Sequence, residues 1–212
     1  MPPFPQRPSH GLAARQHRSA QSSGRGLKRI CVMCGSSEGR NPAYGESAQE
    51  LGRTLAARGI GIVYGGAGVG LMGALADAAC EAGGEVIGVI TPDLADLVGH
   101  EGVRLERVDT IHQRKARFEA LSDGYVALPG GFGTLEELFE AVTWNQLGLH
   151  DKPVGLLNVA GYFDTLLQYL RHVQGEGFVR REHVDGIIVE DEPGRLIDAL
   201  GQYRPVRLGK WW

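Results

Sequence analysis

The sequence predicts an α/β fold, a Rossmann-like, doubly wound parallel sheet flanked by helices on both faces. The first observation is that short apolar runs alternate along the chain with helical patterns, the order typical of parallel strands joined by helical crossovers. The second is that the apolar runs are continuous, which indicates strands buried on both faces. The third is the glycine content of 32 in 212 residues, much of it placed where apolar runs end and tight turns are needed.

The individual elements follow one another in a regular order, and no internal repeat interrupts them. Strands are expected at the apolar runs 29–35, 60–66, 85–90, 103–108, 124–128, 152–159 and 186–190. Helices are expected at the amphipathic or alanine-rich stretches 41–59, 70–84, 109–123, 134–150, 162–173 and 193–203. Pro42 near the start and Gly59 past the end of the first helix are typical of those positions. Residues 93–103 follow Pro92 without a clear period, so a loop is expected there.

A single folded domain is expected over residues 27–205, between a basic N-terminal tail (1–26) and a short C-terminal tail (206–212). The first 29 residues contain six Lys or Arg and no acid, and the tail is rich in Pro, Gln, Ser and Gly, which is typical of a disordered segment. A basic docking tail and an Arg-rich targeting segment are the alternatives. The net charge of −3 gives no bias toward nucleic acid, and no run of ~18 apolar residues is present. We therefore expect neither nucleic acid nor a membrane as a partner.

Three cysteines, Cys31, Cys34 and Cys80, do not predict a metal site. Cys31 and Cys34 have C-x-x-C spacing, but they fall in a predicted strand, where residues three apart point to opposite faces. A structural zinc site takes four ligands, and neither a second cysteine pair nor a histidine spacing typical of metal ligands is present. We expect free thiols, as in a reducing cytoplasm, and no metal.

Three loops are candidate ligand sites, because ligands of doubly wound sheets bind outside the carboxyl ends of the strands. The first strand ends in CGSS, which contains Gly35 and Ser36. The second ends in YGGAGVG, which contains Gly65 and Gly66, and the fifth ends in PGGFGT. No G-x-S-x-G motif surrounds the serines, so they are expected to be polar contacts and not nucleophiles.

The stretch PGGFGTLEE combines three glycines with the start of a helix. Glycines let the backbone approach a ligand closely, and a helix N-terminus offers free N–H groups and a partial positive charge. Together they predict a phosphate-binding loop, although the G-K-[ST] ending of a P-loop is missing. The competing interpretation is a capping box with Thr134 at the N-cap and Glu137 at N3, in which Glu137 is not free for a substrate.

A second glycine pattern supports a different function. Gly68, Gly70 and Gly73 spell G-x-G-x-x-G between a strand and a helix, and Asp93 follows twenty residues later. This dinucleotide-binding fingerprint predicts an NAD(P)-dependent oxidoreductase. Two features weigh against it: the motif follows the second strand of the sheet, and another phosphate loop lies downstream.

The stretch DTIHQRKARF is expected to begin a helix, with Thr110 and Gln113 as a capping box. Helical spacing then places Arg114 on one face with Arg117 and Phe118. One interpretation is a solvated basic face. If this helix begins near the glycine-rich loop, Arg114 can instead contact a phosphate or a leaving base through its planar guanidinium.

The combination of these motifs resembles the LONELY GUY (LOG) family of cytokinin riboside 5′-monophosphate phosphoribohydrolases. PGGFGTLEE fits the family signature P-G-G-x-G-T-x-x-E. The resemblance covers roughly residues 29–190, where CVMCGSSEG, YGGAGVGLMG, HQRK and TWNQLGLHDKPVGLLN follow in the family's order. Two positions depart from it: Ala67 stands where the family usually has a third glycine, and Ile111 replaces a methionine.

The resemblance implies a Rossmann-like fold, a homodimer with sites near the subunit interface, and a hydrolase without a cofactor. It also implies that Arg114 and Glu137 form the catalytic pair. A nucleoside 5′-monophosphate is the implied substrate. The residues implied or expected to bind it lie in the same motifs: Gly131, Gly133 and Thr134 at the 5′-phosphate with Lys115 nearby, Asp96 where the family tends to have a glutamate, and Gly35, Ser36, Gly65, Gly66, Gly130 and Glu136.

The expected reaction is hydrolysis of the N-glycosidic bond of adenosine 5′-monophosphates, N6-prenylated or not, to the free cytokinin base or adenine and ribose 5-phosphate. Cleavage of this bond builds positive charge on the sugar, which the carboxylate of Glu137 can stabilise while it orients water. An arginine side chain is a poor general acid, because a guanidinium holds its proton too tightly. Arg114 is therefore expected to bind the departing base or the ribose phosphate.

Other functions stay open on the sequence alone. They are the NAD(P)-dependent oxidoreductase and a nucleotide-binding protein without turnover. A pyridoxal-phosphate decarboxylase needs a Schiff-base lysine, and none of the four lysines lies in a recognisable cofactor motif: Lys28, Lys115, Lys152 and Lys210.

Overall fold

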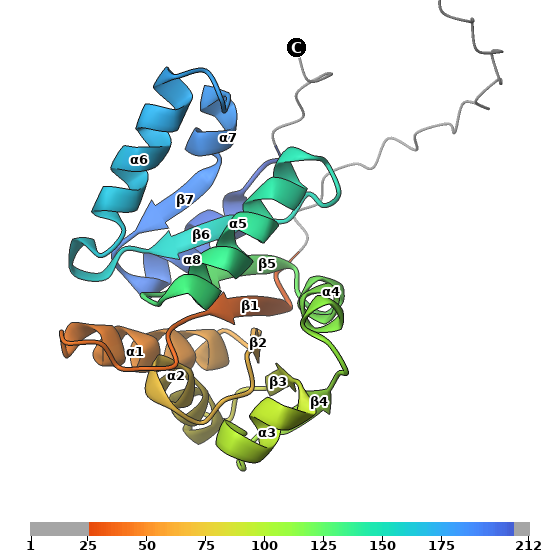
Figure 1. Ribbon diagram of the computed structural model, residues 1–212. Coiled ribbons are helices and arrows are strands. Elements are labelled where there is room, and N and C mark those ends of the chain that lie inside the picture. The colour runs from red at the N-terminus through yellow and green to blue at the C-terminus, as the bar shows by residue number, and fades with distance from the viewer. Residues whose placement is uncertain (1–25, 206–212) are drawn as a thin grey trace, which may run out of the picture.

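The computed structural model describes residues 26–205, which form a seven-stranded sheet with helices on both faces (Figure 1). The strands, all parallel, are β1 (Arg29–Met33), β2 (Gly61–Tyr64), β3 (Val86–Ile90), β4 (Arg104–Arg107), β5 (Gly124–Ala127), β6 (Val154–Leu157) and β7 (Ile187–Glu190). The helices are α1 (Ala43–Ala57), α2 (Gly70–Glu81), α3 (Pro92–Val98), α4 (Ile111–Leu121), α5 (Phe132–Gln146), α6 (Asp164–Gly175), α7 (Arg181–Asp185) and α8 (Pro193–Gln202), with a 3₁₀ turn η1 (Val159–Gly161). Among these described helices none is long and apolar enough to cross a membrane. The predicted tails lie, apart from Gly26, outside the described residues.

The predicted strands and helices are all present, but the loop expected over residues 93–103 is wrong. Pro92–Val98 forms α3, which begins after the extended residue Thr91. A proline in the first turn and the carboxylate of Asp93 beside it both favour a helix start. No residue of α3 is buried, so the helix leaves no apolar period in the sequence. The five-residue α7 also buries nothing, and it was not predicted for the same reason.

The strand order β4-β3-β2-β1-β5-β6-β7 reverses at β1, which pairs with β2 on one side and β5 on the other. The loops that leave β1 and β5 therefore diverge at their carboxyl ends, the position where such sheets bind ligands. Gly35 connects three loops at this point. Its N–H donates to the carbonyl of Pro129 at 3.0 Å, and its carbonyl accepts from the N–H of Leu71 at 3.1 Å. The three loops that the sequence singles out thus meet at one edge of the sheet.

Each face of the sheet carries its own hydrophobic core. On one face α1, α2 and α8 pack on the strands, and on the other α4, α5 and α6 do so (Figure 1). Cys31 belongs to the second core and Cys34 to the first, which confirms that the C-x-x-C cysteines point to opposite faces. All three cysteines are free, and burial raises the pKa of the Cys31 and Cys34 thiols.

Close packing of α1 on α2 depends on Gly52. A Cβ at this position would lie 2.4 Å from the carbonyl oxygen of Leu75 and 3.1 Å from the nitrogen of Ala79. We expect Gly52→Ala to lower the free energy of unfolding by about 1–3 kcal/mol, because the added methyl overpacks the contact. Gly45→Ala on the same helix is the matched control, since a Cβ there meets nothing within 4 Å.

Urea unfolding of both variants measures the difference. Gly45→Ala should leave stability unchanged or raise it by up to about 1 kcal/mol, because alanine is the better helix former. Equal destabilisation by the two substitutions would contradict a specific role for Gly52 in the contact between α1 and α2.

Candidate active site

Helix α5 begins earlier than a capping box at Thr134 requires. Its N-cap is Gly131, which has extended φ/ψ and no side chain to cap the helix, and its first residue is Phe132. Thr134 is the third helical residue and only 4% exposed, and Glu137 lies in the second turn. The carboxylate of Glu137 bonds to Arg114 and does not fold back on the helix start. The capping-box interpretation of Thr134 and Glu137 is therefore wrong.

The N-terminus of α5 presents free amide groups. Among residues 26–205 no acceptor pairs with the N–H groups of residues 131–134. A Cβ at Gly131 or Gly133 would meet nothing within 4 Å, so the space beside these two α-carbons is open. Gly130 differs, because a Cβ there would lie 2.1 Å from the hydroxyl oxygen of Thr134. Packing requires the first glycine, and the other two leave room for an anion.

Arg114 reaches this edge from α4, whose start is capped as the sequence predicts. The Thr110 hydroxyl accepts from the N–H of Gln113 at 3.1 Å, and the Gln113 side chain accepts from the N–H of Asp109 at 2.8 Å. The cap fixes the first turn of α4, so that the next residue after Gln113 points inward under the carboxyl ends of β2 and β3.

The guanidinium of Arg114 is largely buried, with 13% of the side chain exposed. It donates to the carbonyl of Val89 at 2.8 Å and to the carbonyl of Gly65 at 3.1 Å. It also donates to Glu137 Oε1 at 3.0 Å and lies 4.9 Å from the centre of the Phe118 ring. The solvated-face interpretation is therefore wrong for Arg114.

Glu137 is the anionic partner, with 16% of its side chain exposed. Burial raises the pKa of Glu137 above its ordinary value, while the charge of Arg114 opposes that rise. Within the described residues only Oε1 of the carboxylate has a hydrogen-bond donor, so the second oxygen is available to a ligand. A buried carboxylate with a raised pKa beside an open anion site is an arrangement suited to acid–base chemistry.

Lys115 is paired with two carboxylates of α5. Its Nζ lies 2.5 Å from Glu136 and 2.6 Å from Glu140, and 11% of its side chain is exposed. The hydrogen bonds that Lys115 donates to Glu136 and Glu140 raise its pKa. The three side chains tie α4 to α5 on both sides of Glu137.

The other residues predicted to bind a substrate differ in their burial and in whether they contact Arg114 and Glu137. Gly35 is buried at the switch point, and Ser36 beside it is exposed. Gly65 contributes the carbonyl that holds Arg114, and Gly66 has a positive φ of 78°. Asp96 lies on α3, is 75% exposed and pairs with Arg107 at 3.6 Å, outside the hydrogen-bonded group.

The G-x-G-x-x-G glycines are used for packing. Gly70 has a φ of 59°, and a Cβ there would lie 2.4 Å from the backbone of Ser36 and Ser37. A Cβ at Gly73 would lie 2.7 Å from the carbonyl oxygen of Gly68. Both glycines are therefore required where one backbone segment packs against another. The oxidoreductase alternative is not favoured.

Sequence reasoning did not identify two groups at this edge. The carbonyl of Val89 accepts from Arg114, but a backbone acceptor in a buried strand has no sequence signature. Tyr162, in the turn after β6, donates its hydroxyl proton to the carbonyl of Gly130 at 2.6 Å. Its only signal was a position after a strand of the predicted parallel sheet.

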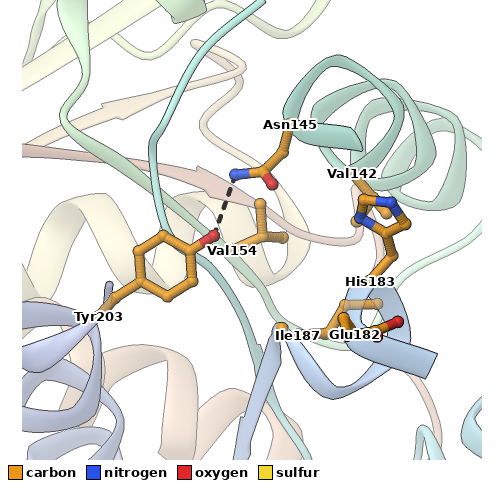
Figure 2. Close-up of a pocket in the computed structure, with 8 residues that line it drawn as sticks. Val142, Asn145, Val154, Glu182, His183, Ile187 and Tyr203 are labelled. Carbon is orange, nitrogen blue, oxygen red and sulfur yellow. Dashed lines mark hydrogen bonds between the residues drawn. The ribbon is translucent and has the colours of Figure 1, made fainter. Parts of the chain in front are cut away.

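A pocket at the opposite edge of the sheet is not the candidate site. It lies between α5, α7 and β7 and contains the hydrogen bond between Asn145 and the Tyr203 hydroxyl at 3.3 Å (Figure 2). It encloses about 20 Å³, room for about one water molecule. Its lining contains none of the predicted site residues: Val142, Asn145, Val154, Glu182, His183, Gly186, Ile187 and Tyr203.

The fold and this edge define a Rossmann-like α/β protein whose candidate ligand site lies at the topological switch point. A family model described as "Possible lysine decarboxylase" matches residues 72–200. A rice relative (Oryza sativa subsp. japonica) is 47% identical over 181 residues, which cover 84% of this chain and 74% of the relative. A cytokinin riboside 5′-monophosphate phosphoribohydrolase of Arabidopsis thaliana is 46% identical over 179 residues, 84% of this chain and 83% of the relative. The chain belongs to the LOG family.

Solved structures share the fold. A molybdenum cofactor binding protein from Rippkaea orientalis superposes with a TM-score of 0.62 at 25% identity, over 82% of this chain and 96% of that chain. A molybdenum cofactor carrier protein from Chlamydomonas reinhardtii gives a TM-score of 0.63 at 23% identity, with the same coverage of both chains. At this level of identity the second likeness concerns the fold alone.

Lys115 and Lys152 do not fit a pyridoxal-phosphate decarboxylase, despite the description of the family model. A Schiff base forms from an uncharged amine, which burial without a carboxylate partner favours. Lys115 is instead paired with two carboxylates that raise its pKa. Lys152 donates to the carboxylate of Glu119 at 2.7 Å and to its carbonyl.

We expect Glu137→Gln to change the pH dependence of stability. The pKa of Glu137 is raised in the folded protein, so the unfolded chain loses this proton at a lower pH than the folded one. Between the two pKa values the contribution of Glu137 to stability falls as the pH rises. Glutamine does not titrate, so this fall should be missing in the variant.

Urea unfolding of both proteins from about pH 4 to about pH 7 measures the effect, because an unperturbed glutamate titrates at the lower end of this range. The free energy of unfolding of the wild type minus that of Glu137→Gln should decrease with pH. An increase would mean that the ion pair with Arg114 outweighs burial and lowers the pKa of Glu137.

Proposed function

We propose that the chain hydrolyses the N-glycosidic bond of adenosine 5′-monophosphates, including N6-prenylated ones, and releases the free base and ribose 5-phosphate. The observation that carries the proposal is the buried pair of Arg114 and Glu137 beside the free amides of α5. The phosphoribohydrolase activity named for the Arabidopsis relative supports the same substrate class.

The N-terminus of α5 is proposed to bind the 5′-phosphate. The N–H groups of Gly131, Gly133 and Thr134 are free to donate, and the positive end of the helix dipole adds to the attraction. Open space beside the two glycines fits a phosphate oxygen close to the backbone. The nucleotide would then be anchored by its anionic end, with its sugar toward the second turn of α5.

Glu137 is proposed to act on the sugar and the attacking water. As the bond between C1′ and the base nitrogen breaks, the electron pair leaves with the base and positive charge develops on the ring. The Glu137 carboxylate stabilises this charge and takes a proton from the water whose oxygen bonds to C1′. The nitrogen of the departing base, which keeps the electron pair, takes a proton from solvent. The raised pKa of Glu137 makes it a stronger base than an exposed glutamate.

Arg114 is proposed to position Glu137 and to contact the substrate. Three of its N–H groups are used on Val89, Gly65 and Glu137. A guanidinium has five such donors, so two remain for the base or the ribose phosphate. Its proposed role is to bind and orient, and the proton of the departing base comes from solvent.

The remaining parts of the proposal concern the whole protein. We propose one catalytic domain over residues 27–205 and a homodimer with the sites near the subunit interface. The large apolar side chains exposed near the catalytic edge, Phe132 (94%) and Leu97 (78%), support a contact with a second subunit. The free thiols are compatible with the cytoplasm as its location. Analytical ultracentrifugation would test the dimer.

Replacing Glu137 with Gln is expected to lower kcat for release of adenine from AMP by about 10²–10⁴-fold, because the base and the stabilising anion are both lost. Arg114→Lys should also lower kcat, since an ammonium cannot bind the two carbonyls and the carboxylate in one plane. Chromatographic assay of free base and ribose 5-phosphate measures both effects. Glu50→Gln, an exposed position on α1, is the control. Full activity of Glu137→Gln would refute the assignment.

The pH profile of the wild type gives an independent measurement. The reaction needs ionised Glu137, so kcat/KM should fall as the pH falls through its pKa. Because burial raises that pKa, the acid limb should lie above the ordinary glutamate value of about 4.3. The residual activity of Glu137→Gln should lack this limb. A limb at or below the ordinary value would argue against a buried general base.

A further inference from the structure

Tyr162 contacts the glycine-rich loop from an element that no motif includes. Its hydroxyl donates to the carbonyl oxygen of Gly130 at 2.6 Å. Tyr162 follows η1 in the turn after β6, and β6 is the neighbour of β5 in the sheet. The turn therefore lies at the carboxyl edge, beside the loop that leads from β5 into α5.

The turn that carries Tyr162 is held firmly. Ala160 and Gly161 both have positive φ, 50° and 71°, which folds the chain back sharply after β6. The side chain of Asn158 accepts from the N–H of Phe163 at 2.7 Å and donates to Asp164 at 2.8 Å. A turn fixed in this way places the tyrosine hydroxyl at a defined position.

The ring of Tyr162 is fixed by aromatic neighbours. Its centroid lies 5.5 Å from that of Tyr44 and 5.0 Å from that of Phe163, both in edge-to-face geometry. Such pairs are favourable on their own. The ring therefore keeps its place without the hydroxyl, and the hydrogen bond to Gly130 can be removed separately.

The hydrogen bond fixes the orientation of one peptide group. The carbonyl of Gly130 and the N–H of Gly131 belong to the same planar trans unit and point in opposite directions. Two successive glycines leave the adjoining backbone torsions free of side-chain restraint. When Tyr162 holds the oxygen on one side, the N–H of Gly131 is held toward the other side, where no acceptor pairs with it among residues 26–205.

We propose that Tyr162 is a positioning residue for the phosphate site, acting through the Gly130–Gly131 peptide. The inference rests on the proposed function, in which Gly131 is a donor to the 5′-phosphate. Tyr162 does not touch the sugar or the base in this arrangement. Its loss should therefore weaken binding of the anionic end of the substrate and leave the chemical step unchanged.

The test is Tyr162→Phe, which keeps the ring and removes the hydrogen bond. KM for AMP should rise roughly three- to tenfold, the range expected for one neutral hydrogen bond, while kcat stays the same. Inhibition by each product tests separately the part of the site that binds the sugar phosphate and the part that binds the base. The inhibition constant of ribose 5-phosphate should rise by the same factor, and that of adenine should not change.

Tyr169→Phe is the matched control, an exposed tyrosine on α6 whose hydroxyl has no hydrogen bond within the described chain. It should leave every constant unchanged. A purely structural role of Tyr162 would lower the melting temperature and shift kcat together with KM. That result, or equal effects of Tyr162→Phe on ribose 5-phosphate and adenine, would overturn the proposal, as would no effect at all.

Calorimetry with AMP and with inorganic phosphate keeps this test separate from the proposed activity, because it requires no turnover. If the wild type binds both ligands without hydrolysing AMP, the proposed function fails. Even then, weaker binding of AMP and phosphate by Tyr162→Phe than by the wild type would support the role of Tyr162, and equal binding would overturn it. A wild type that binds neither ligand would overturn both proposals.

Discussion

The carboxyl edge of the sheet is organised by the need to satisfy one largely buried guanidinium. Arg114 finds its acceptors on elements that are distant in sequence: the end of β3, the loop after β2, and α5. Leaving a charge unpaired in the interior is strongly unfavourable, so these elements cannot shift independently of α4. The carboxylate of Glu137 is held at 3.0 Å by the same group. A single residue thus sets the distance between the helix that carries the acid and the strands that form the site.

The same capping-box pattern occurs at the starts of α4 and α5, but it caps only α4. A Thr with Gln or Glu three residues later predicts a capping box at both α4 and α5. The first is correct, because Thr110 is itself extended and its hydroxyl accepts from the N–H of Gln113, so it is the true N-cap. The second is wrong, because the chain becomes helical at Phe132, directly after Gly131. Spacing alone cannot distinguish the cases, since the start of α5 is set by the packing of Gly130 against Thr134 and Gly35.

The sequence predicts the sheet and the edge well because buried strands and glycine turns leave strong local signals. It predicts α3 poorly because a helix that buries nothing has no apolar period. The sequence also does not tell whether a glycine is required for close packing or leaves room for a ligand. Gly70 and Gly73 are required where one backbone segment meets another, whereas Gly131 and Gly133 border open space. Only the coordinates of the neighbouring atoms distinguish a glycine needed for packing from one that leaves room for a ligand.

The two adjacent carboxylates of α5, Glu136 and Glu137, differ in their surroundings. Glu136 is the more exposed, and it is neutralised by Lys115, which also binds Glu140 one turn further on. Glu136 raises the pKa of Glu137, whereas the charge of Lys115 lowers it, so the lysine offsets the repulsion between the neighbours. Burial remains the larger influence and keeps the Glu137 pKa raised. Arg114 and Lys115, both on α4, therefore hold the two acids in place. One oxygen of Glu137 still has no donor among the described residues. The N-terminal amides of the same helix, α5, are also free within the described chain. In the proposed reaction one helix holds both an anion and an electron-poor sugar carbon, because its N-terminal amides attract the anion and the carboxylate in its second turn stabilises the carbon.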